Sequence, residues 1–279
     1  MSQDVQAQAI QIDTGTTQLL CEIRERVAVI TLNRPEARNA LSDQLTPALR
    51  RMIRERGEDE RVGALLITGA GTAFCAGGDV KGMGDNSNKK DWTYDQRVND
   101  LIERERLLTG ALTAVRKPTV AALPGAAAGA GLAIALACDV RIAAQSAFVS
   151  AGYSKIGLSG DYGVAWLLTR AVGSPIAREM MFTSARVDSA RAERIGLFNR
   201  VVADDVLRSE AFALARTMAN GPAVALAHIK DNLDEAAHIE LDAALQREAR
   251  RLVLSSRTDD HREAVRAFVE KRPPVFSGR

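Results

Sequence analysis

The chain has 279 residues and a mass of 30.0 kDa, enough for one large domain or two small ones around a buried core. Lys and Arg number 37 and Asp and Glu 35, so a net charge of +2 gives no general attraction to nucleic acid or to a membrane. Three cysteines are too few for a disulfide framework, and their odd number indicates a reducing compartment such as the cytoplasm. The three histidines form no pattern typical of a metal site.

The first 18 residues are polar and lack the apolar segment of a signal peptide, so we expect a flexible tail at 1–18. The longest uncharged stretch, 118–138, has the length of a bilayer span. Two prolines and three glycines interrupt it, however, and much of the rest is alanine. It therefore predicts a buried strand, a glycine-rich turn and a helix of small residues, and no contact with a membrane.

The N-terminal half combines strand and helix patterns. Two β-rich runs within 21–32 predict a hairpin, and Ser42 is expected to cap a helix that Gly57 ends. A short apolar run at 62–68 predicts a buried strand. The following elements are a helix at 98–115, a strand at 119–123, a helix at 131–137 and a strand at 139–143. Their alternation indicates α/β crossovers with right-handed connections.

After Asp161 the pattern is almost wholly helical, with one short strand expected within 198–202. The predicted helices cover 164–172, 176–182, 189–194, 204–219, 223–237, 241–255 and 260–271. The sequence thus predicts an N-terminal tail at 1–18, an α/β core at 19–200 and a helical region at 201–279.

Two glycine-containing segments follow predicted strands. In the first, Gly77 and Gly78 leave backbone N–H groups open to a ligand, and such groups can stabilise an oxyanion. In the second, Gly129-Ala130-Gly131 precedes a helix whose N-terminus favours negative charge. A tight turn and close packing of small residues are the alternatives. Neither segment matches a dinucleotide fingerprint or a phosphate-binding loop.

A third segment places Asp161 in a glycine-flanked turn before an apolar helix. Its carboxylate can cap that helix or, if desolvated, act as an acid or a base. Cys75 could be a nucleophile, but no histidine lies within 150 residues of it and its neighbours are small and apolar. A buried and inert thiol is therefore the favoured interpretation.

Five segments together resemble the enoyl-CoA hydratase/isomerase (crotonase) family, and the similarity covers residues 19 to 276. They are ITLNRPEARNAL (30–41), AFCAGGDVKGM (73–83), PGAAAGAGLAIALACDVRIAA (124–144), LTRAVG (168–173) and TDDHREAVRAFVEKRPPVF (258–276). The resemblance implies an α/β fold with a crotonase-like ββα spiral core, a helical C-terminal trimerisation region and assembly as a trimer or a dimer of trimers.

The resemblance also implies an acyl-CoA substrate, in which coenzyme A is part of the substrate and no separate cofactor is needed. The N–H groups of Gly78 and Ala130 would hold the thioester oxygen as it becomes enolate-like. By position in the family motifs, the residues that would contact the CoA moiety are Ala37, Arg38, Ala76, Asp79, Lys81, Phe268 and Lys271.

The chain departs from the hydratases at the two positions where they carry glutamates, which here are Ala133 and Tyr153. Neither side chain can activate water as a carboxylate does. Asp161, eight residues after Tyr153, matches the acidic residue of dienoyl-CoA isomerase-like and dehalogenase-like relatives. A single carboxylate suffices to move a proton and hence a double bond, and Tyr153 could orient substrate or water.

We therefore expect an enzyme that isomerises a double bond through Asp161, ahead of hydratase or C–X cleavage chemistry. A non-catalytic acyl-CoA-binding or scaffold subunit is the alternative that the missing glutamates favour. RNA binding, which some relatives show, has little support because the charge is nearly neutral and aromatic residues are few.

Overall fold

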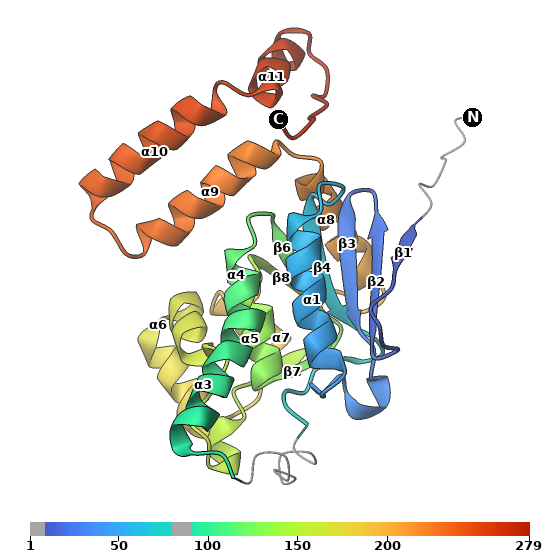
Figure 1. The fold of residues 1–279 in the computed structure, drawn as a ribbon, viewed down its shortest axis with the longest axis vertical. Helices are drawn as coiled ribbons and strands as arrows, with labels where there is room; N and C mark the ends of the chain where they lie inside the picture. The colour runs from blue at the N-terminus through green and yellow to red at the C-terminus, as the bar shows by residue number, and fades with distance from the viewer. Residues whose placement is uncertain (1–8, 80–90) are drawn as a thin grey trace.

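The computed structural model describes residues 9–79 and 91–279 of the chain (Figure 1). Within these residues the larger of two sheets has seven strands in the order β1-β2-β3-β4-β6-β8-β11. They are β1 (Ile10–Ile12), β2 (Leu19–Arg24), β3 (Val27–Leu32), β4 (Ala64–Gly69), β6 (Thr119–Leu123), β8 (Val140–Ala144) and β11 (Arg200–Val202). The pairs are antiparallel from β1 to β3 and parallel from β3 onward.

The smaller sheet has the order β10-β9-β7-β5 in the described part of the chain. Its strands are β5 (Ala73–Cys75), β7 (Ala126–Ala128), β9 (Phe148–Ser150) and β10 (Val187–Asp188). Each of β4, β6 and β8 is followed in the chain by a short strand of this second sheet. This repeated step of two strands confirms the expected α/β fold with a ββα spiral.

The helices alternate with the strands and then dominate the C-terminal third. They are α1 (Leu45–Glu58), α3 (Tyr94–Glu105), α4 (Ala111–Ala114), α5 (Ala130–Ala137), α6 (Val164–Thr183), α7 (Ser189–Arg194), α8 (Leu207–Ala219), α9 (Ala223–Ala236), α10 (Leu241–Ser255) and α11 (Asp259–Val269). The other helical elements of the described residues are two short 3₁₀ helices, η1 (Pro35–Ala37) and η4 (Tyr153–Ile156), and one π-helical turn, η3 (Arg106–Gly110).

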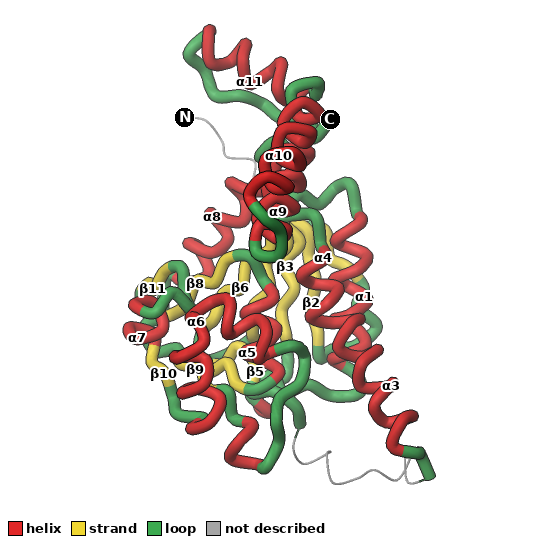
Figure 2. Tube along the Cα trace, turned by 90° about the vertical axis from the view of Figure 1, so that its left-hand side faces the viewer, coloured by secondary structure: helices red, strands yellow, loops and turns green. Residues whose placement is uncertain are grey.

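The core forms between the large sheet and the helices on its two sides (Figure 2). Strand β4 is buried along its whole length, as its apolar sequence predicts for a central parallel strand. Helix α1 buries an apolar stripe that includes Leu45, Leu49 and Ile53 against β2 and β3, and α8 covers β4 and β6. The Ser42 hydroxyl accepts a hydrogen bond from the Leu45 N–H, at 3.1 Å, at the start of α1.

Three expectations need correction. Residues 10–12 are not a loose tail, because the alternating Ile10-Gln11-Ile12 forms an edge strand paired with β2. Gly57 lies inside α1, which continues to Glu58. The helix expected at 98–115 begins earlier, with Thr93 as its N-cap, and is broken by the π-helical turn η3.

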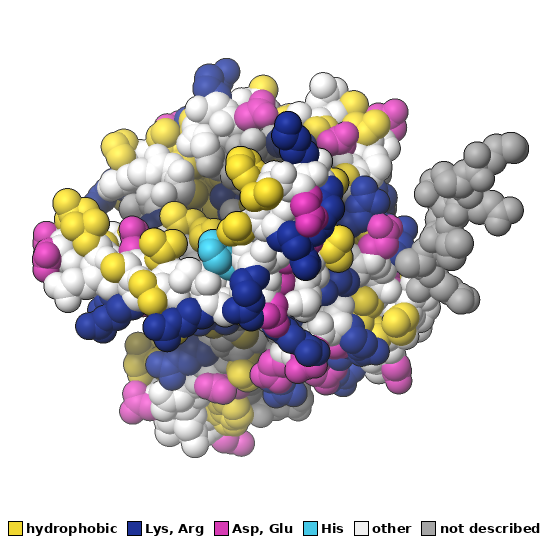
Figure 3. Space-filling view, turned by 90° about the horizontal axis from the view of Figure 1, so that it is seen from above, with side chains coloured by type: hydrophobic (Ala, Val, Ile, Leu, Met, Phe, Trp, Pro, Cys, Tyr) yellow, Lys and Arg dark blue, Asp and Glu magenta, His cyan; other side chains and the backbone are white. Residues whose placement is uncertain are grey.

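The C-terminal helices form an arm that rises from the core (Figures 1 and 2). Neither α9 nor α10 contains a buried residue, and Leu241 and Leu252 are both more than 70% exposed. Seen from above, hydrophobic side chains lie beside a row of basic ones on this part of the molecule (Figure 3). Helix α9 is tied to the core by the ion pairs Lys230–Asp139 and Arg116–Asp231, both at 2.9 Å.

None of the helices in the described ranges is long and apolar enough to cross a bilayer. The stretch 118–138 instead divides into β6, β7 and α5, which confirms the interpretation given to its prolines and glycines.

Candidate active site

Two glycine-containing turns lie side by side at the end of the small sheet. Strands β5 and β7 are parallel, so the turns that follow them leave the same edge of that sheet. Gly77 has φ +96°, and a Cβ there would lie 2.8 Å from the Ala128 carbonyl oxygen and 3.6 Å from the Ala130 nitrogen. The two backbones are therefore almost in contact, and only glycine allows this approach.

Both turns leave a backbone N–H free. Within residues 9–79 and 91–279, neither the Gly78 N–H nor the Ala130 N–H donates a hydrogen bond to any acceptor. Ala130 is the first residue of α5, where a helix leaves N–H groups unpaired and carries partial positive charge. These two donors are available to an external oxygen atom.

The turn at Gly77 and Gly78 is braced by the segment that follows η1. The Leu41 N–H donates to the Gly77 carbonyl at 2.8 Å, and the Ala76 N–H donates to the Arg38 carbonyl at 3.0 Å. Leu41 and Gly78 form an isolated parallel bridge. The residues of the NRP segment thus fix the conformation of the candidate oxyanion-binding turn.

The buried side chain of Asn39 links the NRP segment to the backbone before and within β5, and sequence reasoning missed this residue. It is fully buried, and its Nδ2 donates to the carbonyls of Ala70 and Ala73 at 3.0 and 2.8 Å. Its Oδ1 accepts the Arg34 N–H at 2.8 Å. The signal in the sequence was an asparagine one residue after a turn, a residue type that tolerates the left-handed φ of +57° found there.

Tyr153 and Asp161 form a hydrogen-bonded pair beside the second turn. The Tyr153 hydroxyl donates to Asp161 Oδ1. Tyr153 is only 6% exposed, and a Cβ placed on Gly129 would lie 3.8 Å from its hydroxyl oxygen. The Tyr153 hydroxyl therefore lies between the Asp161 carboxylate, to which it is hydrogen-bonded, and the turn that presents the Ala130 N–H.

Tyr153 and Asp161 both have pKa values above their ordinary ones. Burial raises the pKa of Tyr153, and the nearby Asp161 charge raises it further, so the phenol stays neutral. Burial also raises the pKa of Asp161, and the hydrogen bond from Tyr153 opposes that rise. A partly desolvated carboxylate that is less acidic than usual is suited to moving protons.

The alternative role of Asp161 as a helix cap is wrong. Helix α6 begins at Val164 with Gly163 as its N-cap, and no side chain caps it. The Asp161 carboxylate is directed to Tyr153 because Gly160 and Tyr162 both have positive φ and turn the chain there. Ala133, which the resemblance places where hydratases carry their other glutamate, is fully buried in α5.

The residues expected to contact CoA fall into two groups. Ala37, Arg38, Ala76 and Asp79 lie around the first turn, where Asp79 pairs with Arg34 at 3.2 Å. Lys81 lies outside the described residues. Phe268 and Lys271 lie in and just after α11, which Figure 2 places at the opposite end of the molecule from β5.

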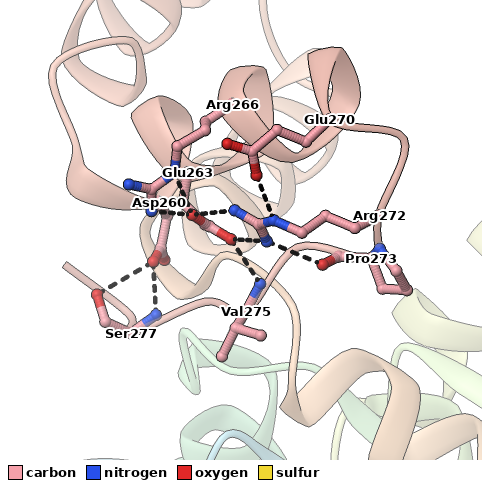
Figure 4. A network of polar contacts seen from close by, with 8 residues as sticks. All are labelled: Asp260, Glu263, Arg266, Glu270, Arg272, Pro273, Val275 and Ser277. Carbon is pink, nitrogen blue, oxygen red and sulfur yellow. Dashed lines mark hydrogen bonds and ion pairs between the residues drawn. The ribbon is translucent and has the colours of Figure 1, made fainter.

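The end of the chain folds back on α11 through a polar network (Figure 4). The buried Asp260 accepts the Ser277 N–H at 2.6 Å and the Gly278 N–H at 3.0 Å. Arg272 donates to Glu263 at 2.6 Å, and this contact holds the pKa of Glu263 well below its usual range. The segment that carries Lys271 is thus fixed at both ends, while the Phe268 side chain is 85% exposed.

Cys75 is fully buried, and burial raises its pKa to about 12. This confirms the expectation of an inert thiol, because a nucleophile must ionise near neutral pH. The described residues contain no cluster of three or more His, Cys, Asp or Glu side chains able to hold a metal ion.

Comparisons with known proteins agree with this geometry. The family model described as enoyl-CoA hydratase/isomerase matches residues 22–279. The probable enoyl-CoA hydratase echA8 of Mycobacterium bovis is 38% identical over 94% of this chain and 98% of its own length. The 1,2-epoxyphenylacetyl-CoA isomerase of Escherichia coli is 34% identical over the same shares. An enoyl-CoA hydratase structure from Polaromonas sp. JS666 superposes with a TM-score of 0.86, at 31% identity, over 92% of this chain and 99% of that one.

The fold and the comparisons together define an acyl-CoA enzyme with a crotonase fold. The chain belongs to the enoyl-CoA hydratase/isomerase (crotonase) family. Its relatives include both hydratases and isomerases.

Proposed function

We propose that this enzyme isomerises a double bond in an acyl-CoA thioester. The observation that carries the proposal is the Tyr153–Asp161 pair beside the Gly129–Ala130 turn. The resemblance to the family implies that Ala133 and Tyr153 stand where hydratases carry their two glutamates. One carboxylate remains to move a proton, and hydration by the two-glutamate route lacks its acid and base.

In the proposed reaction, the thioester oxygen accepts hydrogen bonds from the N–H groups of Gly78 and Ala130. Asp161 takes a proton from one carbon of the acyl group, and the negative charge moves to the thioester oxygen as an enolate. Each backbone donor stabilises that charge by about 3–4 kcal/mol in comparable sites. The same carboxyl group then returns the proton to another carbon, so the double bond moves and no atom is gained or lost.

Tyr153 has a positioning role in this proposal. Its hydroxyl holds Asp161 Oδ1 and leaves the other carboxylate oxygen for the substrate. Because the pKa of Tyr153 is raised, it donates this hydrogen bond without losing its proton.

We also propose that the enzyme is a homotrimer or a dimer of trimers. The exposed leucines of α10 and the exposed Phe268 support this arrangement. Phe268 and Lys271 would then contact the CoA of a neighbouring chain, while Ala37, Arg38, Ala76 and Asp79 contact the CoA bound by their own chain. Analytical ultracentrifugation tests the assembly, and a monomer at micromolar concentration would exclude it.

Proton exchange at the α-carbon tests the chemistry most directly. Wild-type enzyme is incubated in deuterated water with 2-enoyl-, 3-enoyl- and dienoyl-CoA thioesters, and label uptake and double-bond position are followed by mass spectrometry and NMR. We expect exchange and isomerisation with at least one thioester, and a loss of at least about a hundredfold in Asp161→Asn.

Asp205→Asn, at an exposed position after β11, is the matched control and should keep wild-type rates. Turnover of Asp161→Asn within a few-fold of wild type would remove Asp161 from the mechanism. Formation of 3-hydroxyacyl-CoA at a rate above that of isomerisation would instead favour hydration, the activity that the names of several relatives carry.

A further inference from the structure

A cavity whose described lining shares no residue with the candidate active site is lined by arginines. It has a volume of about 560 Å³ and lies between the first half of α1, the turn after β1 and the η3 region. Three of its lining residues are Arg50, Arg51 and Arg54, all on α1. Among the described residues that line it, none is acidic and none belongs to the Gly77 or Gly129 turns.

The positive charge in this cavity is largely uncompensated. Arg51 donates to the Thr14 carbonyl at 2.5 Å and lies 3.8 Å from Glu55. Arg50 and Arg54, in contrast, pair with no carboxylate among the residues that the structure describes. Three like charges within about one helical turn repel one another unless an anion lies between them.

Arg50 provides the most specific observation. Its Nε and Nη2 atoms are buried and have no hydrogen-bond partner. These two nitrogens form the edge of the guanidinium group that binds two oxygen atoms of a carboxylate or a phosphate side by side. Beside Arg50 lies the phenol of Tyr162, and the Arg50 charge opposes the rise in the Tyr162 pKa that burial causes.

A buried guanidinium edge without an acceptor is unfavourable in the free protein. Both nitrogens are closed to solvent, so the Arg50 side chain must turn toward the cavity to meet an oxyanion there. That contact would remove this penalty, and the anion would neutralise Arg54 as well. The Thr16 hydroxyl donates to Gln44 Oε1 at 3.5 Å, and the Gln44 Nε2 group, which also lines the cavity, can donate a further hydrogen bond to such a ligand.

We propose that this cavity binds a small oxyanion ligand, a phosphorylated or polycarboxylate compound, through Arg50 and Arg54. The Nε–Nη2 edge of Arg50 gives the directional contact, and Arg54 gives the second charge. Arg51 is already held by Thr14 and adds to the positive potential. Its described lining shares no residue with the site proposed for acyl-CoA, although Arg50 lies beside Tyr162, the residue after Asp161. The proposal does not depend on the identity of the catalysed reaction.

Isothermal titration of the full-length protein with pyrophosphate and, separately, with citrate tests the proposal. We expect saturable binding of at least one of them, weakened by added salt. Binding of pyrophosphate alone would assign the ligand to phosphorylated compounds, and binding of citrate alone would assign it to polycarboxylates.

The variants locate the bound anion. Arg50→Gln and Arg54→Gln should each weaken binding at least tenfold, and Arg50→Lys should weaken it as well because lysine lacks the two-pronged edge. Arg178→Gln, which removes an exposed arginine on α6, is the control and should bind as wild type does. Arg54 is exposed, so its variant keeps the test valid even if an Arg50 variant fails to fold.

Two results would overturn the proposal. One is the absence of saturable binding with both anions. The other is binding that is equal in wild type, Arg50→Gln and Arg54→Gln, because the anion would then be bound elsewhere on the protein.

Discussion

The Tyr153 hydroxyl donates a hydrogen bond to the carboxylate of Asp161, eight positions further along the chain, across a loop that turns at Gly157 and Gly160. Both side chains are largely shielded from water, and this burial raises the pKa of each. The hydrogen bond acts on the two groups in opposite directions, since it favours the ionised carboxylate and the neutral phenol. The pH dependence of the enzyme should therefore report on this contact.

We expect Tyr153→Phe to move the acid limb of kcat/KM to higher pH. The substitution removes the hydrogen bond that lowers the pKa of Asp161, while the burial that raises this pKa remains. Because the carboxylate must be ionised to take a proton, the rate is lost below its pKa and recovered above it. A pH–rate profile from about pH 4 to about pH 9 measures the shift, and both acid limbs should lie above the ordinary Asp pKa of about 3.9.

Tyr94→Phe is the control for this experiment, because Tyr94 is 80% exposed on α3. Its profile should overlay that of wild type. An acid limb at the same pH in Tyr153→Phe and wild type would show that the phenol does not act on the catalytic carboxyl group.

Removal of one backbone donor should reduce kcat with little change in folding. Ala130→Pro deletes the N–H at the first position of α5, where proline is well tolerated and no helical hydrogen bond is lost. We expect kcat to fall by roughly 10²–10³, the effect of losing one oxyanion donor. Steady-state kinetics and a thermal melt, recorded on the same preparation, measure the two quantities.

Ala130→Gly retains the N–H and should keep kcat within a few-fold of wild type. A proline variant that melts as wild type does and also turns over at the wild-type rate would exclude the Ala130 N–H as a donor.

The sequence predicts the large elements well and the small sheet poorly. β6, α7 and α10 have the predicted bounds, because apolar or amphipathic patterns with clear ends specify them. β5 and β7 have three residues each, and β7 is all alanine, so neither carries a pattern of its own. They become strands only because parallel pairing with neighbours far along the chain satisfies their backbone groups.

The candidate site shows the same division. The two glycine-containing turns and Asp161 can be singled out because such turns and an isolated acid stand out in a sequence, and the resemblance to the family then points to Gly78 and Ala130. The hydrogen bond between Tyr153 and Asp161 cannot, since it depends on the path of the loop between them. The role of Asn39 depends likewise on carbonyl groups more than thirty residues away.

Because the two turns lie so close together, we expect an alanine at Gly77 to destabilise the protein far more than an alanine at Gly163, although both glycines have a positive φ. In Gly77→Ala the new Cβ would lie 2.8 Å from the Ala128 carbonyl oxygen, so the turns must separate. In Gly163→Ala, at φ +70°, nothing lies within 4 Å of the new Cβ. We expect the second change to cost only the left-handed strain, about 1 kcal/mol, and the first to cost clearly more and to abolish turnover.

Urea unfolding and α-proton exchange, measured side by side on both alanine variants, check this prediction. Equal losses in the two variants would mean that the contact between the turns does not matter for either property.

Asn39→Ala should lower both the free energy of unfolding and kcat. The change leaves the carbonyls of Ala70 and Ala73 and the N–H of Arg34 without their partner in a buried place. Each unsatisfied group costs about 1–3 kcal/mol, so a total loss of roughly 3 kcal/mol or more is expected. kcat falls as well because the segment that braces Ala76 and Gly77 loses its anchor.

Two further variants separate the causes. Asn39→Gly removes the strain of φ +57° but also lacks the hydrogen bonds, so it should remain almost as unstable as Asn39→Ala. Asn199→Ala removes an exposed asparagine with one hydrogen bond to the Arg141 N–H, and should cost about 1 kcal/mol or less. If Asn39→Gly were as stable and as active as wild type, the three hydrogen bonds would have no part in holding the oxyanion-binding turn.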